Sequence, residues 1–367
     1  MKIKRVVDNT ALLLYYYLEI VFQTARKLGK KKRKREVLMV SIKDVAKRAG
    51  VAISTVSKVL NNYPNVSDET KDRVNKAVEE LNFVPNSVAA ALSSKQAGRV
   101  ALLVNINIKT NAIDEIDMQY ISGALNKAME LNLDVITLFF FMFQNKSSDE
   151  IVRYLQSQSI AGIIIYGISK ENKVLHELIA SQQFKCVVID APIVNASTSS
   201  VGIDHKKAQY DVAKKTIEDN NCKRVLYIAG KRNGYVTDER IAGMEELVKE
   251  KNLTMLVRNG EFSELQARNI TMKYAKNKDV VVCASDLMAI GAMKALTEMD
   301  IFRPVCGFDG IILMGYVGKQ MNTVRQDFAG ISRKAMEELH RLLSGKEGRT
   351  VILPHTLIRM KYEDIIA

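Results

Sequence analysis

Short apolar runs alternate with amphipathic stretches from residue 100 to residue 353, and this alternation constrains the fold more than any other feature of the sequence. Strands that are rich in Val, Ile and Leu throughout are typical of parallel sheets covered by helices on both faces. About 250 residues of this pattern exceed what one open sheet needs, so we predict two parallel-sheet subdomains. The predicted strands are Val100–Ile106, Val135–Phe141, Gly162–Tyr166, Val187–Asp190, Val225–Gly230, Val280–Ala284, Val305–Phe308 and Val351–Leu353.

A purely helical pattern precedes these sheets. Ser41 can cap a first helix over Ile42–Ala49, and a second helix runs from Ile53 to Leu60. Ser67 caps a third helix, in which apolar residues recur at helical spacing. We therefore predict a small all-α domain ahead of an α/β core.

The spacing of three residues within the first two helices is typical of a helix-turn-helix. Ala46 is small where the helices would touch, Gly50 allows a left-handed turn, and Val56 anchors the second helix. An ordinary helical hairpin is the alternative on this spacing alone.

The net charge of +13 is concentrated at the N-terminus, where residues 1–38 contribute +8. The basic run Lys30–Arg35 could contact DNA phosphates. The apolar run Leu12–Phe22 is too short to span a bilayer, so we expect no membrane segment there. Residues 1–38 do not conform to the regular pattern that begins at Met39, and we interpret them as a tail that results from a mis-assigned start. On this hypothesis Lys30–Glu36 is a translated ribosome-binding site, and Met39 is the native start.

Known catalytic and metal-binding patterns are missing from the sequence. It has no Gly-x-Ser-x-Gly elbow, no complete phosphate loop and no histidine pair at metal spacing, so we expect neither an enzyme nor a cofactor. The cysteines are far apart, and we expect them to be buried free thiols in a reducing cytosol. They are Cys186, Cys222, Cys283 and Cys306.

The chain resembles the LacI/GalR repressor family from Ile42 to Leu92, and more loosely as far as about residue 360. The resemblance is carried by Ile42-Lys43-Asp44-Val45-Ala46, Ser54-Thr55-Val56-Ser57-Lys58-Val59-Leu60-Asn61, Leu81-Asn82-Phe83-Val84-Pro85-Asn86 and Gly307-Phe308-Asp309. It implies a helix-turn-helix head at 39–85, a hinge helix and linker at 86–98, and a sensor core at 99–367. The core would hold two Rossmann-like subdomains around a ligand cleft, the first at about 99–196 plus 328–350 and the second at about 197–327 plus 351–367.

The resemblance also implies which residues contact DNA. Ile53, Ser54 and Lys58 would face base edges in the major groove. Lys58 stands where the family usually has Arg, and Lys cannot form the same two-pronged bond to guanine. Ala52 likewise departs from the usual Ser and loses a capping hydroxyl. The expected phosphate and sugar contacts are Ser41, Thr55, Ser57, Asn61, Ser67 and Thr70.

Residues 86–94 match the family's hinge helix, which begins at Asn86. Leu92 would insert between base pairs from the minor groove, and Ala89 would let two hinge helices approach. Because an Ala-rich helix this short is unstable alone, we expect it to fold only on DNA beside its partner. A plain linker is the alternative.

Six core residues match positions that contact the family's effectors. Arg240 and Asp309 form a pair that suits a vicinal diol, and aromatic rings stack on the apolar face of a sugar. We expect Asp286 to cap a helix rather than to bind ligand. The predicted effector-binding residues are Tyr166, Arg240, Ser285, Asp309, Gln326 and Phe328.

The resemblance implies a cytosolic homodimeric repressor on a pseudo-palindromic DNA operator. A sugar in the cleft would change the angle between the subdomains and hence the spacing of the hinge helices. A purine or a phosphorylated partner protein is the alternative controller. A solute-binding protein is the alternative of another class, since it shares the core fold but lacks a DNA head.

Overall fold

A computed structural model describes residues 41–60, 66–81, 83, 99–105, 115–317 and 320–360. The chain divides into two units, residues 1–94 and 95–367. The predicted tail at 1–38 and the predicted DNA contacts Asn61, Asn86, Ala89 and Leu92 lie outside the described residues.

The first unit contains, within the described residues, the helices α2 (Ile42–Ala49), α3 (Ile53–Leu60) and α4 (Asp68–Glu80). The bounds of α2 and α3 agree with the prediction. Their core includes Val45, Ala46 and Val56. Gly50 ends α2 with φ +65°, and its N–H donates to the Ala46 carbonyl. The predicted left-handed turn is confirmed, because this backbone conformation favours glycine.

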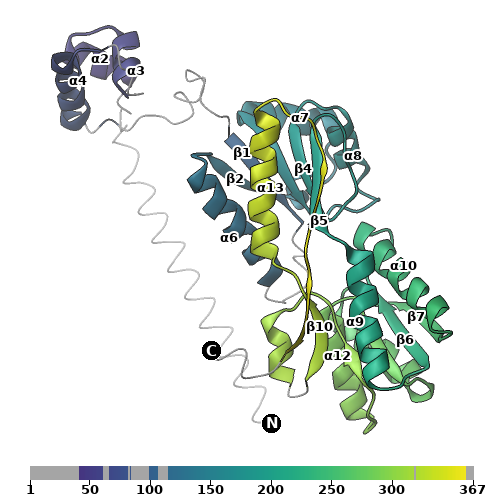
Figure 1. Ribbon diagram of the computed structural model, residues 1–367. Helices are drawn as coiled ribbons and strands as arrows, with labels where there is room; N and C mark the ends of the chain where they lie inside the picture. Colours follow the sequence, from purple (N-terminus) through teal and green to yellow (C-terminus); the bar gives the residue numbers. More distant parts are fainter. Residues whose placement is uncertain are drawn as a thin grey trace, which may run out of the picture. The chain divides into compact units, whose positions relative to one another are not determined.

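The first subdomain of the second unit is a six-stranded sheet in the order β11-β5-β4-β3-β1-β2, with every pairing parallel. Helices α6 (Glu115–Glu130) and α13 (Phe328–Leu343) cover one face, and α7 (Ser148–Ser157) and α8 (Lys173–Ala180) cover the other (Figure 1). The strands are β1 (Arg99–Val104), β2 (Val135–Phe139), β3 (Ile160–Tyr166), β4 (Lys185–Ile189), β5 (Thr198–Ile203) and β11 (Thr350–Leu353).

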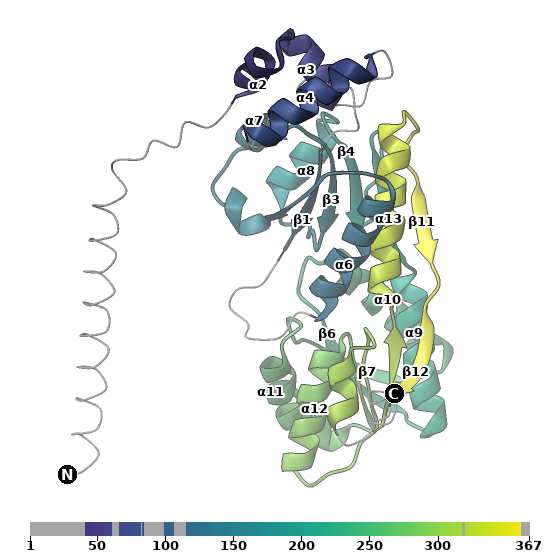
Figure 2. The same ribbon diagram turned by 90° about the vertical axis from the view of Figure 1, so that its left-hand side faces the viewer.

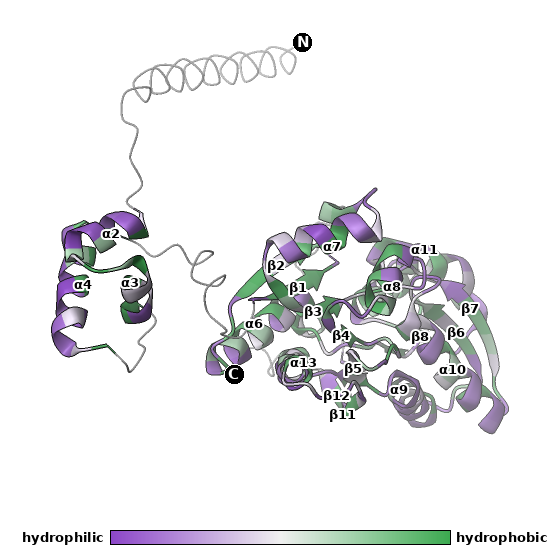
Figure 3. Ribbon diagram, turned by 90° about the horizontal axis from the view of Figure 1, so that it is seen from above, coloured by the Kyte–Doolittle hydropathy of each residue, from purple (hydrophilic) through white to green (hydrophobic). Residues whose placement is uncertain are grey.

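Burial on both faces explains why these strands are almost continuously apolar. In β1, Val100 and Leu102 belong to the cluster under α6 and α13, whereas Ala101 and Leu103 belong to the cluster under α7 and α8. Figure 3 shows β1 and β2 as hydrophobic strands and α9 and α10 as largely hydrophilic helices. Alternate side chains therefore enter two separate cores.

The second subdomain repeats this architecture with the sheet order β12-β10-β9-β8-β6-β7, in which only β12 runs antiparallel to its neighbour. Helices α9 (His205–Asp219) and α10 (Tyr235–Glu250) pack together, as do α11 (Glu264–Tyr274) and α12 (Asp286–Glu298). The strands are β6 (Arg224–Ala229), β7 (Thr254–Asn259), β8 (Val280–Cys283), β9 (Val305–Cys306), β10 (Met321–Arg325) and β12 (Thr356–Met360).

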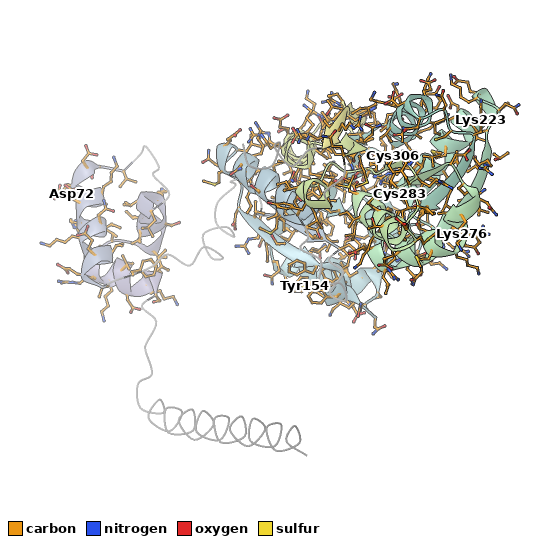
Figure 4. The ribbon with its side chains drawn as sticks, turned by 90° about the horizontal axis from the view of Figure 1, so that it is seen from below. Asp72, Tyr154, Lys223, Lys276, Cys283 and Cys306 are labelled. Atoms are coloured by element: carbon orange, nitrogen blue, oxygen red, sulfur yellow. The ribbon has the colours of Figure 1, made fainter. Side chains whose placement is uncertain are left out.

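The cysteines agree with the prediction of buried free thiols. Figure 4 places Cys283 and Cys306 inside the second subdomain, whereas Lys223 and Lys276 lie at its edge. Burial raises the pKa of the Cys306 thiol to about 12, so this thiol stays protonated at neutral pH.

The subdomain boundaries differ from the prediction in two places. Strand β5 pairs in parallel with β4, so the chain enters the second subdomain at His205 rather than near residue 197. Strand β11 pairs with β5, Val351 opposite Val201, and therefore belongs to the first subdomain. In the described residues the backbone crosses between subdomains after β5, after β10 and between β11 and β12, the last crossing running beside α13 (Figure 2).

Four strands were not predicted because polar side chains interrupt their apolar character: β5, β7, β10 and β12. In β5 the Ser200 hydroxyl donates 2.7 Å to the Ala191 carbonyl, and Ser199 Oγ accepts from the Arg349 N–H at 3.1 Å. The buried Thr198 Oγ1 has no hydrogen-bond partner among the described residues. The strand predicted over Val135–Phe141 ends instead at Phe139, where the 3-10 helix η2 (Phe140–Phe143) begins.

Gly243 permits the close packing of α10 on α9, because a Cβ there would lie 2.2 Å from the Lys206 carbonyl oxygen. We expect Gly243→Ala to lower the free energy of unfolding by about 1–3 kcal/mol, since the backbones must separate. Urea unfolding measures the loss. The control Glu245→Ala, exposed on the same helix, should change stability by less than about 0.5 kcal/mol; equal effects of the two variants would contradict the packing argument.

Candidate DNA interface and effector site

Helix α3 leaves its predicted base-reading face open. Ile53 is 45% exposed, and Ser54 and Lys58 are also exposed. Val56 and Val59 point the other way, into the core of the head. An exposed Ile at the start of an otherwise polar helix face has no partner in the hydrophobic core, which is the property that a groove-reading residue needs.

Two side chains of α4, Arg73 and Glu80, fix the geometry of the helix-turn-helix. Arg73 Nη2 donates to the carbonyls of Ala49 and Gly50, at 2.6 and 3.1 Å, and so holds the turn. Arg48 of α2 pairs with Glu80, with Nε 2.7 Å from the carboxylate. The Arg73 bonds satisfy carbonyls at the end of α2 that have no partner within the helix, and the Arg48–Glu80 pair ties α2 to α4.

The predicted backbone-contacting residues stand at helix starts or on the sides of α3. Ser41 donates from its N–H and hydroxyl to the Asp44 carboxylate, at 2.9 and 2.7 Å. Ser67 precedes α4, and its hydroxyl lies 2.9 Å from that of Thr70. Thr55 and Ser57 are partly exposed on α3. The N–H groups of Thr55 and Val56 bond to the carbonyl of Ala52, whose side chain offers no capping oxygen.

All six predicted effector residues line one cavity of about 1450 Å³ between the two subdomains. Tyr166 and Phe328 come from the first subdomain, and the others come from the second. The cavity is bordered by the segments that directly follow strands of both sheets. Ligand sites of open parallel sheets form at this carboxyl edge.

Arg240 is the centre of the polar side of the cavity and is only 4% exposed. Its guanidinium carbon lies 3.6 Å from the centre of the Phe308 ring, and Nη1 donates to the Ala284 carbonyl. Its Nε lies 3.4 Å from His205 Nδ1, and Nη2 lies 3.7 Å from Asp309 Oδ1. The guanidinium is therefore fixed in position by stacking and hydrogen bonds.

Asp309 is held in an unfavourable environment for a carboxylate. Burial raises its pKa to about 8, an effect that Arg240, at 3.7 Å, offsets only in part. Its backbone has φ 127°, a conformation that costs about 1–3 kcal/mol for a residue other than glycine. Gln326 Nε2 donates 3.0 Å to Asp309 Oδ1, and buried Gln326 Oε1 accepts no hydrogen bond among the described residues.

The opposite wall is aromatic. Tyr120 of α6 lies 5.0 Å from Tyr166 and 5.2 Å from Phe328, measured between ring centres. The Tyr166 hydroxyl is 2.6 Å from that of Ser332, which satisfies its polar end. Both predicted aromatic residues line the cavity and also belong to the hydrophobic core.

The expectation for Asp286 is wrong, because Ser285 caps α12 by accepting from the Met288 N–H at 3.3 Å. Asp286 is fully buried and accepts from the N–H groups of Gly310 and Ile311, at 2.7 and 2.9 Å. It also accepts from the Thr323 hydroxyl at 2.6 Å. It thus fixes the loop that carries Asp309.

Asp190 and His205 also belong to the site, and they were not predicted. Asp190 follows β4 and accepts from the Tyr120 hydroxyl at 3.2 Å, while its Oδ1 lies 2.9 Å from His205 Nε2. Burial opposes its ionisation, yet His205, Arg240 and Tyr120 together hold the pKa of Asp190 below its ordinary value. Its position after a parallel strand is the sequence signal that could have identified it.

The two subdomains also touch at the rim of the cavity. Lys170, after β3, pairs with Asp238 of α10. Glu171 Oε1 accepts from Asn233 Nδ2 at 2.8 Å. These exposed contacts join the loop after β3 to the loop after β6 and to the first turn of α10, and each contributes little on its own.

Comparison with known proteins matches both units. Residues 41–86 match the family described as bacterial regulatory proteins, lacI family, and residues 216–360 match the periplasmic binding protein-like domain. Catabolite control protein A of Staphylococcus aureus (strain MRSA252) is 29% identical over 337 residues, covering 87% of this chain and 98% of the relative. The transcriptional repressor PurR of Vibrio vulnificus (strain CMCP6) is 26% identical, covering 84% and 93%.

Solved structures show the same fold. A lac repressor dimer bound to operator and the anti-inducer ONPF superposes with TM-score 0.75 at 22% identity, covering 88% of this chain and 99% of that one. A complex of the transcriptional regulator CelR with cellobiose gives TM-score 0.63, also at 22% identity, covering 88% and 99%.

A helix-turn-helix head joined to a two-subdomain core with a ligand cleft defines a DNA-binding transcription regulator with an effector-binding domain, not an enzyme. The chain belongs to the lacI family of bacterial regulatory proteins. In the described part of the chain, no helix is both long and apolar enough to cross a membrane.

The raised pKa of Asp309 predicts a pH-dependent stability. The unfolded carboxyl loses its proton near pH 4, whereas the folded one holds it to about pH 8. Folding therefore binds a proton between these values, and the contribution of Asp309 to stability is lost as pH rises through that window. Urea unfolding of the wild type and Asp309→Asn from pH 5 to 9 should give curves whose difference changes in this direction. Parallel curves would contradict the assignment.

Proposed function

We propose that the protein is a homodimeric repressor of a pseudo-palindromic operator, and that a carbohydrate in the core cavity controls its operator affinity. The observation that carries the effector class is the buried set Arg240, Asp309 and Gln326 on the wall opposite the aromatic residues. Fixed donors and acceptors facing an aromatic wall suit a hydroxylated ring, which has polar edges and apolar faces.

The donor and acceptor pattern of this set supports a polyol. The guanidinium offers donors, the Asp309 carboxyl can accept or donate around its raised pKa, and Gln326 Oε1 needs a donor. A sugar hydroxyl both donates and accepts, so adjacent hydroxyls can satisfy all three groups. A buried acceptor without a donor costs about 1–3 kcal/mol, which ligand binding would recover.

Exposed apolar side chains of the core support a second copy of the chain as partner. Met118 is 64% exposed and Met129 is 76% exposed along α6, with Leu125 between them on the same side of the helix. Such a stripe of exposed apolar side chains on a helix whose other side packs on the core is typical of an interface between subunits. The lac repressor structure that shares this fold is itself a dimer on operator.

Control of DNA binding would pass through the relative angle of the subdomains. Three backbone crossings join the subdomains in the described residues, and the rim contacts such as Lys170–Asp238 are individually weak. A ligand that contacts both walls would favour one angle over another. The angle would set the spacing of the two hinge segments, with Asn86, Ala89 and Leu92 acting at the minor groove.

Each alternative effector, a purine or a phosphorylated partner protein, is supported by one similar protein. A relative named PurR and a relative named catabolite control protein A share this chain's architecture at similar identity. A purine would also stack on the aromatic wall, whereas a phosphorylated protein would bind the outer surface. The carbohydrate is favoured because adjacent hydroxyls can each donate and accept, and so can bond to the carboxyl, the guanidinium and the amide of the cavity together.

Lys58 should contribute to sequence reading beyond its charge. Operators are first selected from a random DNA pool by the wild-type protein. The Lys58→Ala variant should bind these operators about tenfold or more weakly than the wild type, as expected for one lost base contact. Lys76→Ala removes the same charge from an exposed position on α4 and should cost less. Fluorescence anisotropy at one fixed salt concentration measures both, and equal losses would argue against base reading by Lys58.

The effector class can be tested on the full-length protein by calorimetry with a panel of sugars, nucleobases and nucleosides. We expect a sugar to bind, and Gln326→Ala to weaken that binding about tenfold because one buried hydrogen bond is lost. Gln266→Ala, exposed on α11, is the matched control. Binding of a nucleobase alone would favour the purine, and binding of no small molecule would favour the partner protein.

A further inference from the structure

The amino edge of the second sheet is a basic surface that lies opposite the effector cavity. Strands β6, β8 and β9 are parallel neighbours, so the segments that precede them meet at one edge. Each segment carries a basic residue: Lys223 before β6, Lys278 before β8 and Arg303 before β9. Figure 4 shows Lys223 and Lys276 at the edge of this subdomain. Basic residues that are distant in sequence therefore share one surface.

Lysines on the two helical faces of the second subdomain differ in their partners. On α9 every lysine pairs with a carboxylate; these are Lys206, Lys207, Lys214 and Lys215. In contrast, four lysines around the end of α11 and the amino edge form no ion pair among the described residues. They are Lys223, Lys273, Lys276 and Lys278. Their charge is not neutralised within the described chain, so it attracts groups of opposite charge from outside.

Nearby carboxylates do not neutralise these lysines, because they have other partners. Asp279 lies 2.7 Å from Arg224 and also accepts from the backbone N–H of Lys223 at 3.1 Å. Glu298 of α12 pairs with Arg268. Asp300, which is exposed after α12, forms no ion pair among the described residues. The surface thus keeps an excess of positive charge.

Arg303 holds the backbone of this surface in place. Its Nη1 donates to its neighbour's carbonyl, that of Phe302, at 2.6 Å, and its Nη2 donates to the Lys276 carbonyl at 3.2 Å. Its Nε donates to the Lys278 carbonyl. One side chain therefore connects the 3-10 helix η3 (Ala275–Asn277) with the starts of β8 and β9. A surface whose backbone is already fixed loses less conformational entropy when a partner binds.

Two apolar side chains lie among the lysines. Phe302 is 69% exposed, more than any other aromatic side chain that the structure describes, and Met272 is 38% exposed. Met272 of α11 stands one helical turn before Lys276. Aromatic residues and Met are enriched at contact surfaces between proteins. We call the lysines and these two residues together the lysine face: Lys223, Met272, Lys273, Lys276, Lys278 and Phe302.

We propose that the lysine face is a docking surface for an acidic, amphipathic segment of a partner protein. Carboxylates of the segment would face the lysines, and its apolar side chains would cover Phe302 and Met272. No residue of the lysine face lines the effector cavity. Docking would therefore leave the effector site open, and the inference does not depend on what the effector is.

The side chains around the lysine face favour a protein over a nucleic acid. Phosphate is recognised best by the fork of an arginine, but Arg303 is engaged with three carbonyls and Arg224 with Asp279. Single-stranded nucleic acids also need a series of open rings for base stacking. The Tyr274 ring already contacts Arg258 and Lys273, whose charged groups lie 4.6 and 5.3 Å from its centre.

The test is fluorescence anisotropy of the full-length protein with two labelled peptides of about 20 residues, a length that can form a helix. One peptide carries Glu and Leu at helical spacing, and in the other every Leu is replaced by Ser. Excess unlabelled duplex DNA is added first to occupy the head. We expect the Glu/Leu peptide to bind. The double variant Lys276→Glu, Lys278→Glu should bind it about tenfold or more weakly, because two attractive charges become repulsive.

A matched double variant separates the lysine face from general charge effects. Lys146→Glu, Lys249→Glu changes the net charge equally at two exposed positions elsewhere, and should leave the affinity within about twofold. Equal losses in the two double variants would overturn the docking surface, as would failure of the wild type to bind the Glu/Leu peptide. Operator affinity should be the same in both, since neither changes the head.

Phe302→Ser tests the apolar part of the lysine face. It should weaken binding of the Glu/Leu peptide about fivefold, as expected for a lost aromatic contact, and leave the Glu/Ser peptide unaffected. The control Val194→Ser, 42% exposed on the first subdomain, should change neither. Equal losses for these two variants would overturn the amphipathic character of the partner.

Two further probes test the class of the partner. A single-stranded oligothymidine and vesicles of phosphatidylglycerol should both bind more weakly than the Glu/Leu peptide. Tighter binding of either probe, lost in the Lys276→Glu, Lys278→Glu variant, would assign the lysine face to a nucleic acid or a membrane and overturn the protein partner.

Discussion

The parallel direction of the strands is the constraint on which the rest of the core depends. Parallel neighbours place all their carboxyl ends at one edge of a sheet, and helices must cover both faces. In each subdomain the segments after these strands therefore converge on one edge, and the two edges border the same cavity. Asp190, Ser285 and Asp309, which are distant in sequence, meet there for this reason.

The cavity concentrates features that weaken the fold locally. Asp309 combines burial, a raised pKa and φ 127°, and Asp190 has φ 55°. Asp286, itself buried, stabilises the loop of Asp309 with two hydrogen bonds and accepts a third from Thr323 of β10. A scaffold that holds an unfavourable carboxyl in place is consistent with a site whose groups become satisfied when a ligand arrives.

Local sequence patterns predicted the helices of the head well, because the interactions that form these helices join residues close together in the sequence. Helix period, a capping serine and the turn glycine act within a few residues, so α2, α3 and Gly50 agree with the expectation. The buried strands of the core were predicted for a similar reason, since a continuous apolar run indicates a strand that is covered on both faces of its sheet. The polar strands β5 and β10 were missed, because partners such as the Ala191 carbonyl for Ser200 are created only by the fold.

The sequence by itself therefore determined the kinds of elements, their order, and the six effector candidates, which the structure brings into one cavity. Only the tertiary structure decided that Ser285 rather than Asp286 caps α12, and that β11 joins the first sheet. It also brought Tyr120, Asp190 and His205 to the site, and left Phe141 exposed beside it while burying Phe143. The physical reason is that the burial and the hydrogen-bond partners of a side chain depend on residues far away in the chain, which a local sequence pattern cannot identify.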